Sequence, residues 1–174
     1  MFNRCVYVYS CACPPAANGS GAQVQQWIQT LNSGLVAGST EVVVAPPSVY
    51  VPDVKARLRK DFAVAGQDAF ATTGAHTGEV SASMLKDLGI KYAILGHSER
   101  RQKGETNEIV AAKAKAAVDN GLTVIACLGE TLAEREAGKA FDIITNQLAV
   151  RACACRRRLP PARLTDFARR PTPR

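Results

Sequence analysis

The residue best placed for chemistry is His97, which follows the apolar, strand-length run Tyr92–Leu95 after a single glycine, Gly96. In a parallel α/β protein the carboxyl ends of the strands form the active face. A histidine at that position lies beside the first amides of the following helical turn, which oppose a positive charge on the ring. We therefore expect a neutral ring that donates a hydrogen bond to a substrate oxygen. The alternative is a structural histidine packed under a loop.

Two carboxylates and a thiol are the other candidates. Glu99 follows His97 by two residues, while Cys127 and Glu130 lie at and just after the end of the apolar run Leu122–Cys127. Each has a simpler reading, because Glu99 and Glu130 can be solvated carboxylates and Cys127 can be a packing residue.

The cysteine pairs do not predict a metal site. Cys11 and Cys13, like Cys153 and Cys155, are separated by one residue, and no histidine lies near either pair. A zinc knuckle needs two or more intervening residues. We expect these cysteines to bind no metal.

The positive charge of the chain is concentrated at its C-terminal end. The formal net charge is +7, and residues 151–174 hold eight arginines and one acid, Asp166. The remaining residues therefore carry equal numbers of positive and negative charges. With no net charge outside residues 151–174, the rest of the chain gives no indication of specific nucleic-acid binding.

No run approaches the roughly eighteen apolar residues of a membrane span, and Met1–Ser10 makes a poor secretory signal. We expect a cytoplasmic protein without membrane partners.

The elements that must position these residues alternate in type from Ser20 onward. The expected strands are Glu41–Ala45, Phe62–Gly66, Tyr92–Leu95 and Leu122–Cys127. The expected helices are Gln23–Leu31, Val54–Leu58, Ser81–Leu88 with Ser81 as its cap, Asn107–Asn120 ending at Gly121, and Thr131–Leu148. Continuous apolar strands are buried on both faces, which is typical of a parallel sheet covered by helices.

This alternation predicts an α/β fold with right-handed crossovers, either a doubly wound sheet or a (β/α)₈ barrel. Periodicity alone does not separate these two folds. No Gly-x-Gly-x-x-Gly follows a strand, and the absence of that dinucleotide-binding fingerprint favours the barrel.

Several short motifs occur along the chain in the same order as in a known protein family. They are Gly66–Asp68 (GQD), Gly74–Ser81 (GAHTGEVS), Gly96–Arg101 (GHSERR), Val124–Glu130 (VIACLGE) and Thr131–Gly138 (TLAEREAG). From Gly66 to about Val150 the chain resembles the middle of triose-phosphate isomerase. Asn18–Ser20 and Val44–Pro47 extend the similarity weakly towards the N-terminus.

The resemblance implies a (β/α)₈ barrel that interconverts dihydroxyacetone phosphate and glyceraldehyde 3-phosphate without a cofactor or metal. It implies that His97 is the electrophile and Glu99 a catalytic acid of the site, with Asn18, Cys127 and Glu130 near it.

The resemblance also implies a homodimer that acts on a triose phosphate. Thr77, Gly78 and Glu79 match the loop that, in this family, inserts beside the site of the partner subunit.

The sequence departs from the family pattern at both ends. Ala16 stands where the family has a lysine that offers positive charge to the substrate. Residues 151–174 contain no match to the sixth strand with its glutamate base, to the lid or to the phosphate loops. We expect a truncated barrel domain over residues 1–150, with about five of eight β/α units. Residues 151–174 are expected to form a disordered basic tail, and the chain alone to be inactive.

Two alternatives remain open. The chain could be a non-catalytic partner of an intact isomerase subunit, paired through Gly74–Glu79. Its arginine-rich tail could instead bind nucleic acid or acidic surfaces without specificity, although Phe167 is the only aromatic residue there.

Overall fold

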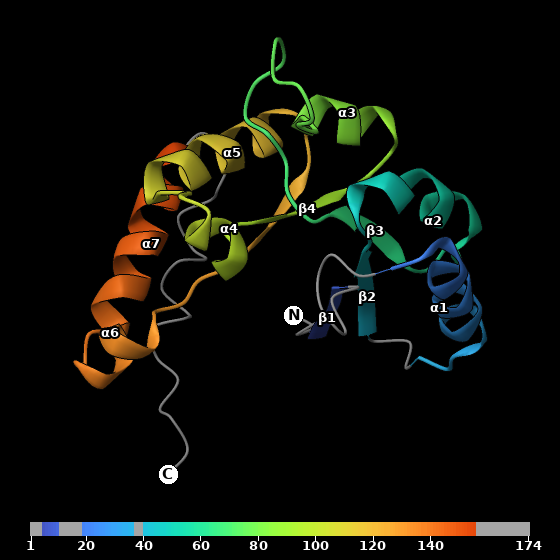
Figure 1. Ribbon diagram of the computed structural model, residues 1–174, viewed down its shortest axis with the longest axis horizontal. Helices are drawn as coiled ribbons and strands as arrows, with labels where there is room; N and C mark the ends of the chain where they lie inside the picture. The colour runs from blue at the N-terminus through green and yellow to red at the C-terminus, as the bar shows by residue number, and fades with distance from the viewer. Residues whose placement is uncertain (1–4, 11–18, 37–39, 156–174) are drawn as a thin grey trace.

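Five parallel strands form one sheet whose strand order equals their order in the chain (Figure 1). The computed structural model describes residues 5–10, 19–36 and 40–155, with the backbone alone for 5–10 and 150–155. The strands are β1 (Cys5–Ser10), β2 (Thr40–Ala45), β3 (Ala63–Gly66), β4 (Tyr92–Leu95) and β5 (Thr123–Ala126). The sheet curls as part of a barrel, so the predicted partial (β/α)₈ architecture is confirmed.

The helices are α1 (Gly21–Ser33), α2 (Val51–Arg57), α3 (Ala82–Asp87), α4 (Ser98–Gln102), α5 (Asn107–Asp119), α6 (Leu132–Glu136) and α7 (Ala140–Cys155), with a 3₁₀ turn η1 (Ser48–Tyr50) before α2. In Figure 1, α1 and α2 lie at one end of the curled sheet and α5 to α7 at the other. None of the helices within the described residues is long and apolar enough to span a bilayer.

Alternate residues of the strands enter two different cores, as the two-residue repeat of a β-strand requires. Val42, Val44 and Leu95 pack in a large cluster with side chains of α1, α2, α3 and α5. Their neighbours Val43 and Ile94 enter a smaller cluster on the other face. The central strands are therefore buried on both faces, as their continuous apolar sequences predicted.

Most predicted elements form within a few residues of their expected bounds, and their ends have the expected caps. Ser81 accepts a hydrogen bond from the amide of Met84 at 3.2 Å at the start of α3. Gly121 ends α5 with φ +83°, a left-handed conformation that favours glycine.

The structure differs from the expected elements in three places. The single helix expected over Thr131–Leu148 is two helices, because Gly138 adopts φ +70° and ends α6. Strand β1, which the sequence analysis did not assign, pairs with β2 in the register Cys5↔Thr40 to Ser10↔Ala45. Helix α7 also continues to Cys155, beyond the helix end expected at Leu148.

Candidate functional site

A cavity of about 670 Å³ opens beside the carboxyl ends of β3 and β4. It brings together five residues that the sequence analysis selected, namely His97, Glu99, Cys127, Gly78 and Glu79. The other lining residues come from η1 and α2, the segment after β3, helix α3, strands β4 and β5 and helix α4: Ser48, Val51, Gly66, Gln67, Asp68, Val80, Met84, Leu85, Leu88, Ile94, Arg100, Lys103 and Ile125.

Two selected residues within the described part of the chain are not part of this cavity lining, and a third lies outside the described residues. Thr77 lies exposed in the loop between β3 and α3, and Glu130 lies in the connection after β5. Asn18 lies outside the described residues, as does Ala16 at the position of the family lysine.

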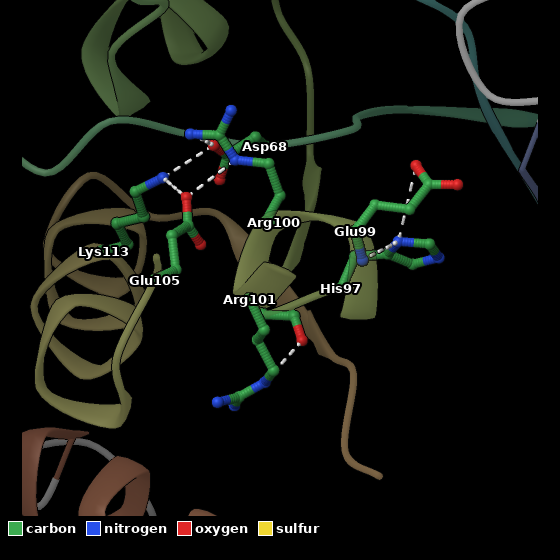
Figure 2. A network of polar contacts seen from close by, with 8 residues as sticks. Asp68, His97, Glu99, Arg100, Arg101, Glu105 and Lys113 are labelled. Atoms are coloured by element: carbon green, nitrogen blue, oxygen red, sulfur yellow. Dashed lines mark hydrogen bonds and ion pairs between the residues drawn. The ribbon is translucent and has the colours of Figure 1, made fainter. Parts of the chain in front are cut away.

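His97 is set at the cavity by a tight turn between β4 and α4. Gly96 is buried with φ +75°, a conformation that L side chains rarely adopt. His97 is the N-cap of α4, and its Nδ1 accepts a hydrogen bond from the amide of Glu99 at 3.4 Å (Figure 2). With Nδ1 as the acceptor, a neutral ring carries its proton on Nε2, which makes Nε2 the donor.

Glu99 lies on the open side of the same turn. Its Oε2 is 3.9 Å from Nδ1 of His97, and its side chain is 54% exposed against 42% for the histidine. Both side chains are therefore accessible from the cavity. Because their mutual contact is weak, either side chain can move to contact a ligand.

The close approach of helix α3 to strand β3 depends on Gly66. A Cβ at Gly66 would lie 2.7 Å from Cδ1 of Leu85 and 3.0 Å from the carbonyl oxygen of Asp68. The next residue, Gln67, donates through Nε2 to the carbonyl oxygen of Ala45 at 2.9 Å, which joins the ends of β2 and β3. These contacts fix one wall of the cavity.

A buried cluster of charges joins the segments after β3 and β4 to helix α5 (Figure 2). Nζ of Lys113, whose side chain is only 2% exposed, lies 2.6 Å from Oδ2 of Asp68 and 2.5 Å from Oε1 of Glu105. Arg100 contacts the same two oxygens, at 3.0 Å from Asp68 and 2.7 Å from Glu105. Two cations thus share two carboxylates.

The electrostatics of this cluster favour the charged forms. Burial alone would raise the pKa of Glu105, but hydrogen bonds from Lys113 and Arg100, together with their charges, lower it. Burial likewise opposes the charge of Arg100, whereas its bond to Glu105 and the nearby carboxylates raise its pKa.

Sequence reasoning missed Lys113, although a signal was present. It stands at helical spacing from Val110, Ala114 and Ala117, on the buried face of α5. A lysine on an apolar helix face indicates a buried partner of opposite charge.

The second arginine of the GHSERR motif supports the turn itself. Arg101 donates through Nε to the carbonyl oxygen of Gly96 at 3.0 Å and through Nη1 to Oδ1 of Asn107 at 2.8 Å. In Figure 2 it extends away from the charged cluster, so Arg100 and Arg101 hold opposite sides of the segment that carries His97.

The connection after β5 forms another part of the site edge. The amide of Cys127 donates to the carbonyl oxygen of Leu95 at 2.9 Å, which places the half-buried cysteine beside the end of β4. The carboxylate of Glu130 is 8% exposed and lies 2.6 Å from Nη2 of Arg135. Its own backbone amide and then Arg135 lower the pKa of Glu130.

The loop between β3 and α3, residues 71–80, projects beyond α3 in Figure 1. Contacts within the loop and with the residue before it hold its shape. Oγ1 of Thr72 contacts Nε2 of His76 at 2.9 Å, and the rings of Phe70 and His76 lie 4.5 Å apart. Gly78, with φ +89°, and Glu79 reach the cavity from this loop.

Within the described residues, no three or more His, Cys, Asp or Glu side chains are grouped so as to hold a metal ion. What this edge of the sheet offers a ligand is an N–H donor at His97, a carboxylate at Glu99 and the cation Lys103, around an apolar floor.

Comparison with known proteins identifies the family. The family model described as triosephosphate isomerase matches residues 16–158. The chain is 50% identical over 135 residues to the cytosolic triosephosphate isomerase of Stellaria longipes, covering 75% of this chain and 52% of that protein. It is 48% identical over 134 residues to the cytosolic enzyme of Oryza sativa subsp. japonica, covering 75% of this chain and 53% of that protein.

The chloroplastic triosephosphate isomerase of Arabidopsis thaliana is 47% identical over 133 residues, covering 75% of this chain and 42% of that protein. The chain spans about half the length of the curated relatives it matches. The curled parallel sheet, the turn that carries His97 and these matches agree, and the chain belongs to the triosephosphate isomerase family.

Proposed function

We propose that this chain carries the electrophile side of a triosephosphate isomerase site, which interconverts dihydroxyacetone phosphate and glyceraldehyde 3-phosphate. The observation that supports this most is the position of His97. The left-handed turn at Gly96 puts its ring at the cavity, with Nδ1 occupied by the amide of Glu99. Membership of the family supports a triose phosphate as the substrate.

The chemistry follows from where charge develops. The isomerisation moves a proton between two adjacent carbons, and the carbonyl oxygen gains negative charge when the first C–H bond breaks. An N–H donor fixed in place before the reaction stabilises that oxygen more strongly in the transition state than in the ground state. We assign this role to Nε2 of His97. The catalytic acid at Glu99 remains a proposal from the family motif.

We further propose that a polypeptide of these 174 residues has no isomerase turnover by itself. Its sequence contains no match to the family's glutamate base, and Ala16 replaces the lysine of the first loop. General base catalysis typically contributes about 10²- to 10⁴-fold, and the missing charge stabilisation adds to this loss.

The proposed assembly is a dimer through residues 74–79, by analogy with the family loop. The projecting, internally bonded form of this loop supports the proposal. A non-catalytic pairing with an intact isomerase subunit is the alternative, and copurification with such a subunit would favour it. We propose the cytosol as the location, since relatives named cytosolic match well, although chloroplastic ones match too.

The test is a repaired chimera. Residues 1–18 are replaced by a family-like first strand with its lysine, and residues 151–174 by a family-like sixth to eighth β/α segment. We expect the chimera to isomerise triose phosphates in a coupled assay while the 174-residue chain does not. In the chimera, His97→Gln should lower kcat far more than it raises KM. Lys115→Met, on the exposed face of α5, is the matched control. A folded, dimeric chimera that binds no triose phosphate and shows no turnover would show that the assignment of His97 is wrong.

A further inference from the structure

Gln147 is a buried polar side chain whose place in the fold has no explanation in packing alone. It is 6% exposed and lies on α7. The two other polar or charged residues buried within the described part of the chain have clear tasks, since Ser81 caps α3 and Lys113 joins the charged cluster. A buried carboxamide is costly unless its donor and acceptor are both paired.

Both groups of the Gln147 amide bind one residue, Gly129. Oε1 of Gln147 accepts from the Gly129 amide at 3.1 Å, and Nε2 donates to the Gly129 carbonyl oxygen at 2.9 Å. We call this pair of bonds the Gln147 clamp. It links residues 18 positions apart and satisfies both backbone groups of Gly129 at once.

The clamp acts where the chain has little else to hold it. Gly129 is exposed, and a Cβ built on it would meet no heavy atom within 4 Å. Two residues earlier, the amide of Cys127 is fixed to Leu95 of β4. One residue later, Glu130 is bound by Arg135, whose side chain is 72% exposed. The clamp adds a contact that fixes the backbone itself between Cys127 and α6.

We propose that Gln147 is a positioning residue for the site edge after β5. The clamp fixes the backbone at Gly129, and this sets the place of Cys127 in the cavity wall and the direction from which Glu130 leaves the strand. The importance of this wall for catalysis rests on the proposed isomerase function. The clamp itself does not, and it can be tested in the 174-residue chain without turnover.

The chemistry of the clamp is specific to a carboxamide. Methionine has a similar length but neither donor nor acceptor. A glutamate carboxylate has an acceptor but no donor, and it would face the Gly129 carbonyl oxygen. A protonated glutamic acid again has one donor and one acceptor. Gln147→Glu should therefore lose the bond to the Gly129 carbonyl oxygen at neutral pH, weaken the clamp, and restore it in acid, a response that mere space-filling by residue 147 would not produce.

The experiment measures amide hydrogen exchange at Gly129 in the full chain by NMR, with the Ala93 amide of β4 as the internal reference. In Gln147→Met we expect the protection of Gly129 relative to Ala93 to fall by about 10- to 100-fold, as removal of a buried hydrogen-bond partner implies. The rate at which iodoacetamide alkylates Cys127, followed by mass spectrometry, should rise in the same variant.

In Gln147→Glu we expect a smaller loss at about pH 7.5, because the carboxylate can still accept from the Gly129 amide but repels the Gly129 carbonyl oxygen. Protection should recover as the pH falls towards about 5, because burial raises the pKa of a carboxyl group. Protection is corrected for the intrinsic exchange rate at each pH, and the native chain is measured over the same range. This comparison within one variant does not depend on the folding of Gln147→Met.

Asn32 provides the matched control. It makes the same kind of clamp, donating through Nδ2 to the Arg57 carbonyl oxygen at 3.0 Å and accepting from the Arg59 amide at 2.8 Å. This clamp joins α1 to the end of α2. Asn32→Ala should lower protection at Arg59 and leave Gly129 and Cys127 unchanged. The proposal is overturned if Gly129 keeps its protection in Gln147→Met, or if Gln147→Glu shows no recovery in acid.

Discussion

Replacement of Lys113 by methionine should destabilise the fold more than any exposed charge change. Methionine fills the space of the lysine stem but removes a cation that lies 2.6 Å from Asp68 and 2.5 Å from Glu105. The cluster then holds two carboxylates and one cation, Arg100, in a region where Glu105 is 8% exposed. Loss of one partner from a buried ion pair costs about 3–5 kcal/mol, mostly because a charge remains buried without compensation.

The assay is urea unfolding followed by fluorescence. Trp27 is the only tryptophan, and it packs against the large core cluster from α1, far along the chain from Lys113. We expect the free energy of unfolding to fall by about 3 kcal/mol or more in Lys113→Met.

Lys115 is the matched control on the same helix. Its Nζ contacts Asp119 at 2.5 Å, but both side chains are more than half exposed. Lys115→Met should therefore change the free energy of unfolding by less than about 0.5 kcal/mol. If the two variants unfold at the same urea concentration, or if Lys113→Met costs below about 1 kcal/mol, the buried-pair reasoning is wrong.

Three further predictions concern the same region. Gly66→Ala should lower the free energy of unfolding in urea by about 1–3 kcal/mol, because its Cβ would lie 2.7 Å from Cδ1 of Leu85. An unchanged free energy of unfolding would show that α3 can shift away from β3 without cost. Gly96→Ala should cost about 1–2 kcal/mol because φ is +75°. In the repaired chimera it should also lower kcat by misplacing His97, so unchanged kcat would contradict the turn's role. The pKa of Glu105 is lowered from 4.5, so its charge stabilises the fold above that pH. That stability should disappear as the pH falls through the lower, folded pKa; Glu105→Gln should show a shallower acid loss.

The sequence predicted the sheet well because parallel strands leave a strong pattern. Val42–Ala45 and Tyr92–Leu95 are continuous apolar runs, and a strand buried on both faces needs such a run. His97 was predictable as a cavity residue from its place after β4. The break in the expected helix after Thr131 was not assigned, although Gly138 marked it, because an isolated glycine inside a helical pattern is often tolerated.

The supporting contacts of the site were less predictable. Lys113 left a one-residue signal on the buried face of α5, but its partners Asp68 and Glu105 are 45 and 8 residues away in sequence. Gln147 left no periodic signal, since it directly follows Thr145 and Asn146, and a run of polar residues in a helix reads as an exposed stretch. Contacts between a side chain and a distant backbone group are fixed by tertiary packing, which a pattern of residue types does not encode.

The strand order of the sheet also bears on how the protein is made. Each strand from β2 to β5 pairs with the strand that was synthesised immediately before it. At about 5–20 residues per second, a ribosome needs several seconds to pass from Thr40 to Thr123, whereas helices and loop closures form within microseconds. Each β/α unit can therefore settle on its predecessor while the next is still in the exit tunnel. The last strand made at any moment is then the growing edge of the sheet, while β1 stays at the opposite edge throughout synthesis.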